Sequence, residues 1–202
     1  MLKLQKLKVA VLIGIALLVS FVFIGLPLIG HAWRKNHPVI YSSVVPASQW
    51  KFFASEEGRF RILFPGKPES TNEVVGNAVV EITLHTFYVW ANQQTEYALN
   101  FSDNPKNVKN LSSKQIFDVG QNGVAEKLGK IAAQHDFKFG NYPARDFEFV
   151  VGGKGNFSGH IRYVLVDQRL YQIMVMFLTE NLHRDDFKIF FDSFSLSNEV
   201  PQ

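Results

Sequence analysis

The sequence predicts an α+β fold in which a β-sheet carries helices on both faces, preceded by one N-terminal transmembrane helix. An uncharged run of 22 residues covers Val9 to Gly30. Several later segments alternate apolar and polar residues and end at turn residues, as strands do. Leu170 to Leu178 is apolar at almost every position, which is typical of a strand covered on both sides.

The run Val9–Gly30 is long enough to be a membrane anchor. As a helix it would extend about 33 Å, and the hydrocarbon core of a bilayer is about 30 Å thick. Three lysines within the first eight residues precede the run, whereas Arg34 and Lys35 follow it. The positive-inside rule therefore favours a cytoplasmic N-terminus. We expect a single-pass protein whose domain lies outside the cytoplasm, on the periplasmic side of a bacterial inner membrane.

A cleaved signal peptide is the alternative interpretation of the same run. Gly30-His31-Ala32 has the small-x-small pattern that precedes cleavage, here before Trp33. The apolar run exceeds the roughly 7–15 residues of a usual signal peptide, which favours retention as a signal anchor. Under either interpretation the domain is exported.

Charge and cysteine content exclude several kinds of function. Residues 1–35 contain five of the 21 Lys and Arg residues and no acidic residue, which leaves 16 basic against 18 acidic residues in the remainder. A nucleic-acid partner, which requires a basic face, is therefore not expected. The chain has no cysteine, so disulfides, zinc–thiolate sites and cysteine nucleophiles are excluded.

The predicted organisation is an anchor followed by one domain. The segment Asn36–Gln49 contains two prolines and three serines and shows no helical period, so it is expected to be an extended tether. A tether this short should keep the strand Phe60–Phe64 close to the lipid. The predicted boundaries are an anchor at 1–35, a tether at 36–49, a globular domain at 50–197 and a tail at 198–202.

Strands fill the first part of the domain. Period-two alternation predicts strands at Phe60–Phe64, at Val79–Trp90 and at Tyr97–Phe101. Pro65-Gly66 ends the first of them. Gly76-Asn77 is the dipeptide expected to form a hairpin turn before the second.

The segment Leu111–Lys130 is the clearest predicted helix of the domain. Ser112 and Gln115 have the spacing of a capping box, and Gly129-Lys130 is expected to end the helix. One face of this helix is apolar and consists of Ile116, Phe117, Val124, Leu128 and Ile131.

Strands and a final helix are predicted after it. Predicted strands are Ile131–Phe139, Ala144–Val151, Phe157–Leu165 and Leu170–Leu178, joined by turns at 140–143, 152–156 and 167–168. Asn181 is expected to cap the last helix. Its apolar face is predicted from four phenylalanines at helical spacing: Phe187, Phe190, Phe191 and Phe194.

Few residues suggest chemistry. His85 and His160, with Glu81, could bind zinc or manganese if their strands are neighbours. No two histidines have a short ligand spacing, so no metal ligand is assigned. Arg145 and Asp146 beside Glu148 are expected to form surface ion pairs of small value.

Two segments resemble functional motifs but lack the residues that those motifs require. Lys154 lies in a glycine-rich stretch that lacks the pattern of a phosphate-binding loop, so a hairpin turn is expected there. Ser158, His160 and Asp167 could suggest a catalytic triad, but the chain has no G-x-S-x-G elbow. No catalytic or cofactor-binding residue is assigned.

Four segments of the domain resemble bacterial PsbP-like domains, over about residues 50–197. These segments are Gly58–Pro68, Tyr142–Phe147, Arg169–Tyr171 and Phe190–Phe194. The wider fold family includes the PsbP subunits of photosystem II and a Ran-binding Mog-type import factor. The resemblance implies a central antiparallel sheet flanked by helices on both faces, an α/β/α sandwich, and a role in binding or assembly.

The resulting functional expectation is a membrane-anchored, extracytoplasmic, non-enzymatic binding or assembly module. Val9–Gly30 would contact membrane lipid, and another membrane or membrane-apposed protein would be the partner. The alternatives are an exported metal-dependent hydrolase and a lipid-binding domain.

Overall fold

The computed structural model describes residues 45–77, 80–91, 95–104, 111–151, 157–178 and 184–197. Five predicted features lie wholly or mostly outside these ranges: the anchor Val9–Gly30, the tether 36–49, the loop around Lys154, the cap Asn181 and the tail 198–202. In the part of the chain that is described, no helix is both long enough and apolar enough to span a bilayer.

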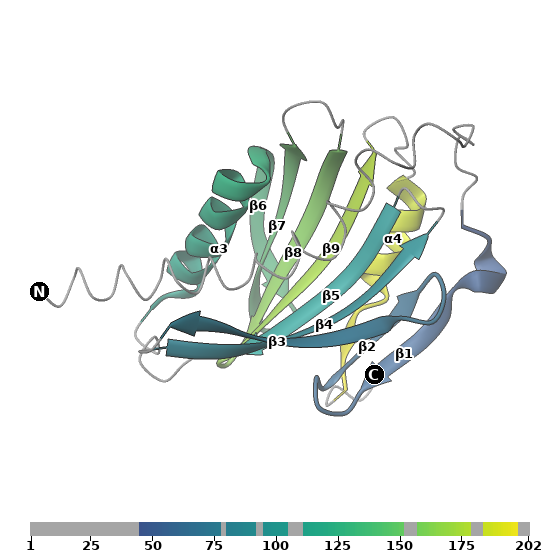
Figure 1. Cartoon of the computed structure of the whole chain (residues 1–202), viewed down its shortest axis with the longest axis horizontal. Helices are drawn as coiled ribbons and strands as arrows, with labels where there is room; N and C mark the ends of the chain where they lie inside the picture. Colours follow the sequence, from purple (N-terminus) through teal and green to yellow (C-terminus); the bar gives the residue numbers. More distant parts are fainter. Residues whose placement is uncertain are drawn as a thin grey trace, which may run out of the picture.

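A seven-stranded sheet forms the centre of the domain, in the order β3-β4-β5-β9-β8-β7-β6 (Figure 1). Each neighbouring pair is antiparallel, so the predicted central antiparallel sheet is confirmed. Its strands are β3 (Glu69–Asn77), β4 (Val80–Ala91), β5 (Thr95–Asp103), β6 (Gly129–Phe139), β7 (Tyr142–Val151), β8 (Phe157–Val166) and β9 (Arg169–Leu178).

The two faces of this sheet are covered differently. Helix α3 (Ser113–Lys127) packs at one side of the sheet, against β6 and β7 (Figure 1). The other face carries helix α4 (Arg184–Asp192) together with a small sheet of order β1-β2-β10. The domain is therefore mostly β-structure, and the predicted sandwich between helices is present only in part. The remaining elements are η1 (Ala47–Gln49), β1 (Lys51–Ser55), β2 (Phe60–Phe64) and β10 (Ser195–Leu196).

Strand β9 shows how the sheet separates two cores. Leu170 and Met174 belong to the core beneath α3, whereas Tyr171 and Ile173 belong to the core beneath α4. All four side chains are almost completely buried. The prediction that this strand is covered on both faces is therefore confirmed.

Helix α3 begins as predicted but ends earlier. The Ser112 hydroxyl accepts a hydrogen bond from the Gln115 backbone N–H, and the Gln115 side chain accepts one from the Ser112 backbone N–H, which confirms the capping box. The predicted end at Lys130 is wrong, because the helix ends at Lys127 and Gly129 already begins β6. A Cβ atom at Gly129 would lie 1.9 Å from the carbonyl oxygen of Val150, so a glycine is required for close pairing with β7.

Two further predicted boundaries are wrong. Gly76 and Asn77 do not form the hairpin turn: they are the last residues of β3, and Asn77 pairs with Val80 of β4. Phe194 is buried as expected, but it follows α4, which ends at Asp192.

The packed domain begins before the predicted boundary at residue 50. The Val45 side chain is only 4% exposed and belongs to the core beneath α4. Its backbone N–H donates a 3.1 Å hydrogen bond to the carboxylate of Asp186. Residues assigned to the tether are therefore part of the domain.

Candidate functional site

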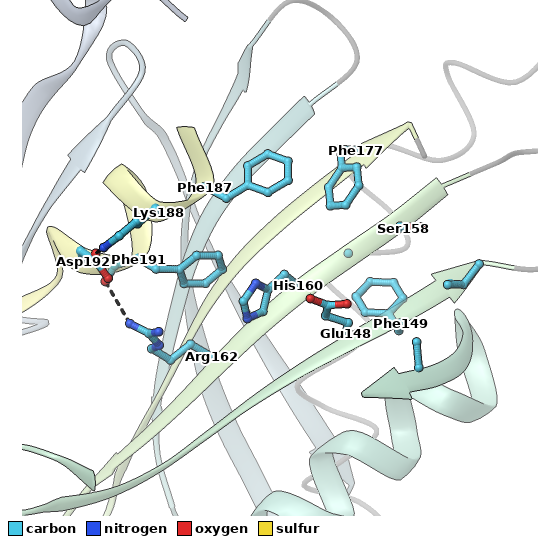
Figure 2. Close-up of a pocket in the computed structure, with 13 residues that line it drawn as sticks. Glu148, Phe149, Ser158, His160, Arg162, Phe177, Phe187, Lys188, Phe191 and Asp192 are labelled. Atoms are coloured by element: carbon cyan, nitrogen blue, oxygen red, sulfur yellow. Dashed lines mark hydrogen bonds and ion pairs between the residues drawn. The ribbon is translucent and has the colours of Figure 1, made fainter. Parts of the chain in front are cut away.

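A groove of about 400 Å³ lies on the α4 side of the large sheet (Figure 2). Strands β6, β7 and β8 form its floor and α4 forms one wall. A volume of this size is within the usual range of ligand sites. The lining alternates between apolar and charged side chains, which is the composition of a binding surface rather than of a core.

Arg162 and Asp146 form the fixed ion pair of the groove. Residues 146 and 162 are direct cross-strand partners, and the guanidinium donates two 2.8 Å hydrogen bonds to the two carboxylate oxygens. The Arg162 guanidinium also lies 5.2 Å from the ring centre of Phe191 and donates to the carbonyl oxygen of Phe191. Arg162 thus connects the sheet to α4.

The pKa of Asp146 reflects this pairing. Burial alone would raise the pKa, but hydrogen bonds from Arg162 and His160 hold the pKa of this carboxyl below its usual value. Asp146 therefore remains an ionised partner of Arg162 at neutral pH and is not available as a proton donor.

His160 and Glu148 lie side by side on the groove floor, facing α4 (Figure 2). The His160 ring packs against Phe191 with 4.4 Å between ring centres, and its Nε2 lies 3.7 Å from Asp146. The Glu148 side chain is exposed. The floor therefore presents one accessible carboxylate next to an imidazole.

Apolar side chains and one ion pair complete the groove. Val150 is 44% exposed, whereas Phe177 and Phe187, which also line the groove, are buried. On α4, Lys188 donates to the carboxylate of Asp192 one turn later. Exposed apolar surface beside charged groups suits a partner that brings both kinds of contact.

The structure does not bring the candidate metal ligands together. His85 is on β4 and His160 is on β8, and strands β5 and β9 lie between them. His85 instead stacks on Phe101, with its Nε2 3.7 Å from Glu57. Among the described residues, no group of three or more histidine and acidic side chains is placed to hold a metal ion.

The triad-like residues are also apart. Ser158 and His160 lie near the start of β8, whereas Asp167 lies in the turn after its last residue. At about 3.3 Å per residue, the nine positions from Ser158 to Asp167 correspond to about 30 Å. These residues cannot form a hydrogen-bonded relay.

The prediction that Arg145 forms a surface ion pair is wrong. Arg145 is not a surface residue: its side chain is 1% exposed and lies under α3, on the face opposite the groove. The guanidinium donates to both oxygens of Asp136, to Asp118 at 2.7 Å and to Gln121 at 3.0 Å. These bonds fasten α3 to the β6–β7 hairpin.

The pKa values of both acidic partners are lowered. Hydrogen bonding to Arg145 is the main reason why the pKa of Asp136 is below its usual value. For Asp118, burial would raise the pKa, but hydrogen bonds from Lys114 and Arg145 outweigh this effect. We assign Arg145, Asp118 and Asp136 a structural role, because the charged groups of these three side chains are hydrogen-bonded to one another.

Glu96 is a buried carboxyl that the sequence analysis did not identify. It is 3% exposed in the middle of the sheet, between Trp90 of β4 and Met176 of β9. Burial raises the pKa of Glu96 to about 8. It lies on the α3 side of the sheet and is therefore no part of the groove.

Comparisons with known proteins give the class of fold. Neither the protein-family profiles nor the curated proteins contain a match. The described domain has a PsbP-like fold. It is similar to the cyanobacterial PsbP (CyanoP) from Synechocystis sp. PCC 6803, with a TM-score of 0.50 and 10% identity over 79% of this chain and 99% of CyanoP. A second similar structure is the protein PA94 of unknown function from Pseudomonas aeruginosa, with a TM-score of 0.43 and 10% identity over 76% and 98% of the two chains.

Proposed function

We propose that this protein is a membrane-anchored, extracytoplasmic binding or assembly module without catalytic activity. Val9–Gly30 would hold it in the membrane with the N-terminus in the cytoplasm. The groove between α4 and β6–β8 would bind another membrane or membrane-apposed protein.

The observation that carries this proposal is the state of the charged groups in the groove. Arg162 is already paired with Asp146, and Lys188 with Asp192. An enzyme needs a nucleophile or a general base held within hydrogen-bond reach of a reacting group. Here the fixed ion pairs shape the surface, and Glu148 and Val150 are left to contact a partner.

The same groups indicate the chemistry of the partner. The exposed Glu148 carboxylate favours a basic side chain, and Val150 favours an apolar one beside it. A short segment carrying an Arg or Lys next to an aliphatic or aromatic residue would match both.

Two alternatives can be tested on the purified chain. A metal-dependent hydrolase would contain stoichiometric zinc or manganese that is lost in both His85→Ala and His160→Ala. A lipid-binding domain would co-purify with lipid in a fixed ratio. We expect neither result.

The groove is tested by affinity purification from crosslinked membranes. The wild-type chain should capture one defined partner, and Glu148→Lys should reduce the yield of that partner about tenfold. Glu81→Lys is the matched control, because Glu81 is also an exposed glutamate but lies on β4, away from the groove. Equal capture by all three proteins would contradict the groove as the binding site.

The anchor is tested separately by topology. A reporter fused after Gln202 that is active only outside the cytoplasm would support the proposal, whereas one active only inside would contradict it. A mature protein that begins at Trp33 would show that the segment is cleaved.

A further inference from the structure

Phe52 is the most exposed large hydrophobic side chain in the described part of the domain. It is 75% exposed on β1, the outer strand of the small sheet. Figure 1 shows β1 at the margin of the molecule, at the opposite end from α3. A phenylalanine this exposed, at the first strand of a domain, points to a contact surface.

The partners of Phe52 across the small sheet define one surface. Phe52 pairs with Leu63, and Ala54 pairs with Arg61. Because residues two apart in a strand share a face, these four side chains lie together. We call them the outer face of the small sheet.

The opposite face of the small sheet is fully occupied. Phe60 and Phe64 are completely buried against the large sheet and α4, and Phe53 packs on Phe87 with 4.9 Å between ring centres. The phenylalanines of Phe60–Phe64 are therefore not available to contact lipid, and the position of this strand close to the lipid stays a prediction. Within the described part of the chain, the outer face is the exposed face of the small sheet.

We propose that the outer face of the small sheet docks on the anionic lipid surface of the bilayer that anchors the chain. The proposal rests on the membrane anchor of the proposed function. The Phe52 ring would enter the interfacial region of the lipid, and the Arg61 guanidinium would bind lipid phosphate.

The length of the connection supports this occupant. Nine residues, 36–44, separate the basic flank Arg34-Lys35 from the buried Val45. Nine residues reach at most about 32 Å even when fully extended, less than the diameter of a domain with a radius of gyration of about 15 Å. The first strand after this connection must therefore lie near the membrane.

Basic residues lie at the end of the small sheet that the connection from the membrane reaches first. Lys51 and Lys67 are exposed at the end of the small sheet where the chain enters it, because Lys51 pairs with Phe64 just before Lys67. Glu56 and Glu57 are exposed at the other end, in the turn after β1. The end with Lys51 and Lys67 would therefore face anionic headgroups, whereas Glu56 and Glu57 at the other end are balanced by the exposed Arg59 and Arg61.

The test measures the depth of residue 52 in a membrane. The chain has no natural cysteine, so Phe52→Cys can be labelled specifically with an environment-sensitive fluorophore. The labelled full chain is reconstituted into vesicles of phosphatidylcholine and phosphatidylglycerol that carry a nitroxide lipid quencher. Val74→Cys is the matched control, because Val74 is 65% exposed on β3, the edge strand of the large sheet.

We expect quenching at residue 52 to be at least threefold stronger than at residue 74. Replacing Arg61 by Glu in the labelled protein, or omitting phosphatidylglycerol, should weaken the quenching at residue 52. Equal quenching at both positions, with the chain still floating with the vesicles, would overturn the docking surface and leave the anchor intact. Failure of the chain to float with the vesicles would overturn both the anchor and the docking surface.

Discussion

At the scale of single residues, two of the buried ionisable side chains in the described structure have different roles. Arg145 has charged partners on α3 and on β6, whereas Glu96 lies in an apolar part of the sheet. A buried charge with partners stabilises the arrangement around it, and one without them makes stability depend on pH.

Replacing Arg145 by alanine should destabilise the fold. Removing one partner of a buried ion pair costs about 3–5 kcal/mol, and we expect the lower end because Asp118 and Asp136 are partly exposed. Lys188→Ala, which breaks an exposed pair on α4, should change the free energy of unfolding by less than about 1 kcal/mol. Urea unfolding of the detergent-solubilised chain measures both, and equal effects would contradict the structural role of Arg145.

Glu96→Gln should stabilise the protein at neutral and alkaline pH. The pKa of this carboxyl is raised from 4.5 to about 8 in the fold, so the native state binds a proton that the unfolded state has released at pH 7. The buried Glu96 carboxyl therefore does not lower the stability of the fold below about pH 4.5. The free energy of unfolding then falls as the pH rises from about 4.5 to about 8.

The gain from Glu96→Gln should therefore grow with pH. Since each pKa unit corresponds to about 1.4 kcal/mol, it should reach up to about 3 kcal/mol at pH 7. Unfolding curves at about pH 4, 6 and 8 measure it. A gain that does not change with pH would contradict the buried, protonated state.

The alternation of residues along β7 could have identified Arg145 from the sequence. Arg145 is two and four positions from the buried Phe147 and Phe149, so its side chain lies on the same face of the strand. The expectation that Arg145 forms a surface ion pair of little stabilising effect came from its residue type alone. Glu96 is different: its burial depends on β5 being central in the sheet, which no local pattern shows.

At the scale of elements, α4 is held by aromatic packing. Phe190 is completely buried, with its ring centre 5.2 Å from Tyr97 and 5.3 Å from Phe64. The helix therefore joins the large sheet to the small one. This contact also fixes the wall of the groove.

Phe190→Ala should lower the free energy of unfolding by about 3–5 kcal/mol, as expected for the loss of a buried aromatic side chain. Ile189→Ala is the control on the same helix, because Ile189 is 40% exposed and its truncation should cost about 1 kcal/mol or less. Thermal unfolding of both variants gives the comparison. Similar losses would mean that α4 is not anchored through Phe190.

Strand positions could be predicted from the sequence, but strand order could not. Alternation of apolar and polar residues located β2, β4, β5, β7 and β8, and a continuous apolar run located β9, because both patterns depend only on local burial. The order depends on α3 carrying the chain from β5, in the middle of the sheet, to β6 at its far edge. The groove follows from that order, since it requires β6–β8 beside α4. Arg162 and Lys188 were therefore missed.

At the scale of the whole molecule, the burial of Val45 predicts where the domain can be cut. A chain that begins at residue 36 keeps Val45 and its hydrogen bond to Asp186, and it should unfold cooperatively. A chain that begins at residue 50 loses both and should be less stable by about 2 kcal/mol. Urea unfolding of the two truncated proteins tests this, and equal stability would contradict a role for Val45.

Loss of the anchor should affect function without affecting folding. If the chain acts on a partner at the membrane, an exported protein without Met1–Lys35 should fold and yet fail to replace the full chain in the cell. Full replacement by the unanchored protein would mean that tethering is not needed.

Site-specific photo-crosslinking in intact membranes shows whether the groove contacts a membrane protein. A photoreactive phenylalanine analogue at Val150 lies in the groove, whereas the same analogue at Val74, which is the more exposed of the two positions, lies on β3. We expect one crosslinked membrane protein with the probe at 150, less of it when Glu148→Lys is added, and none with the probe at 74. The same product from both positions, or from neither, would contradict the groove as the binding site.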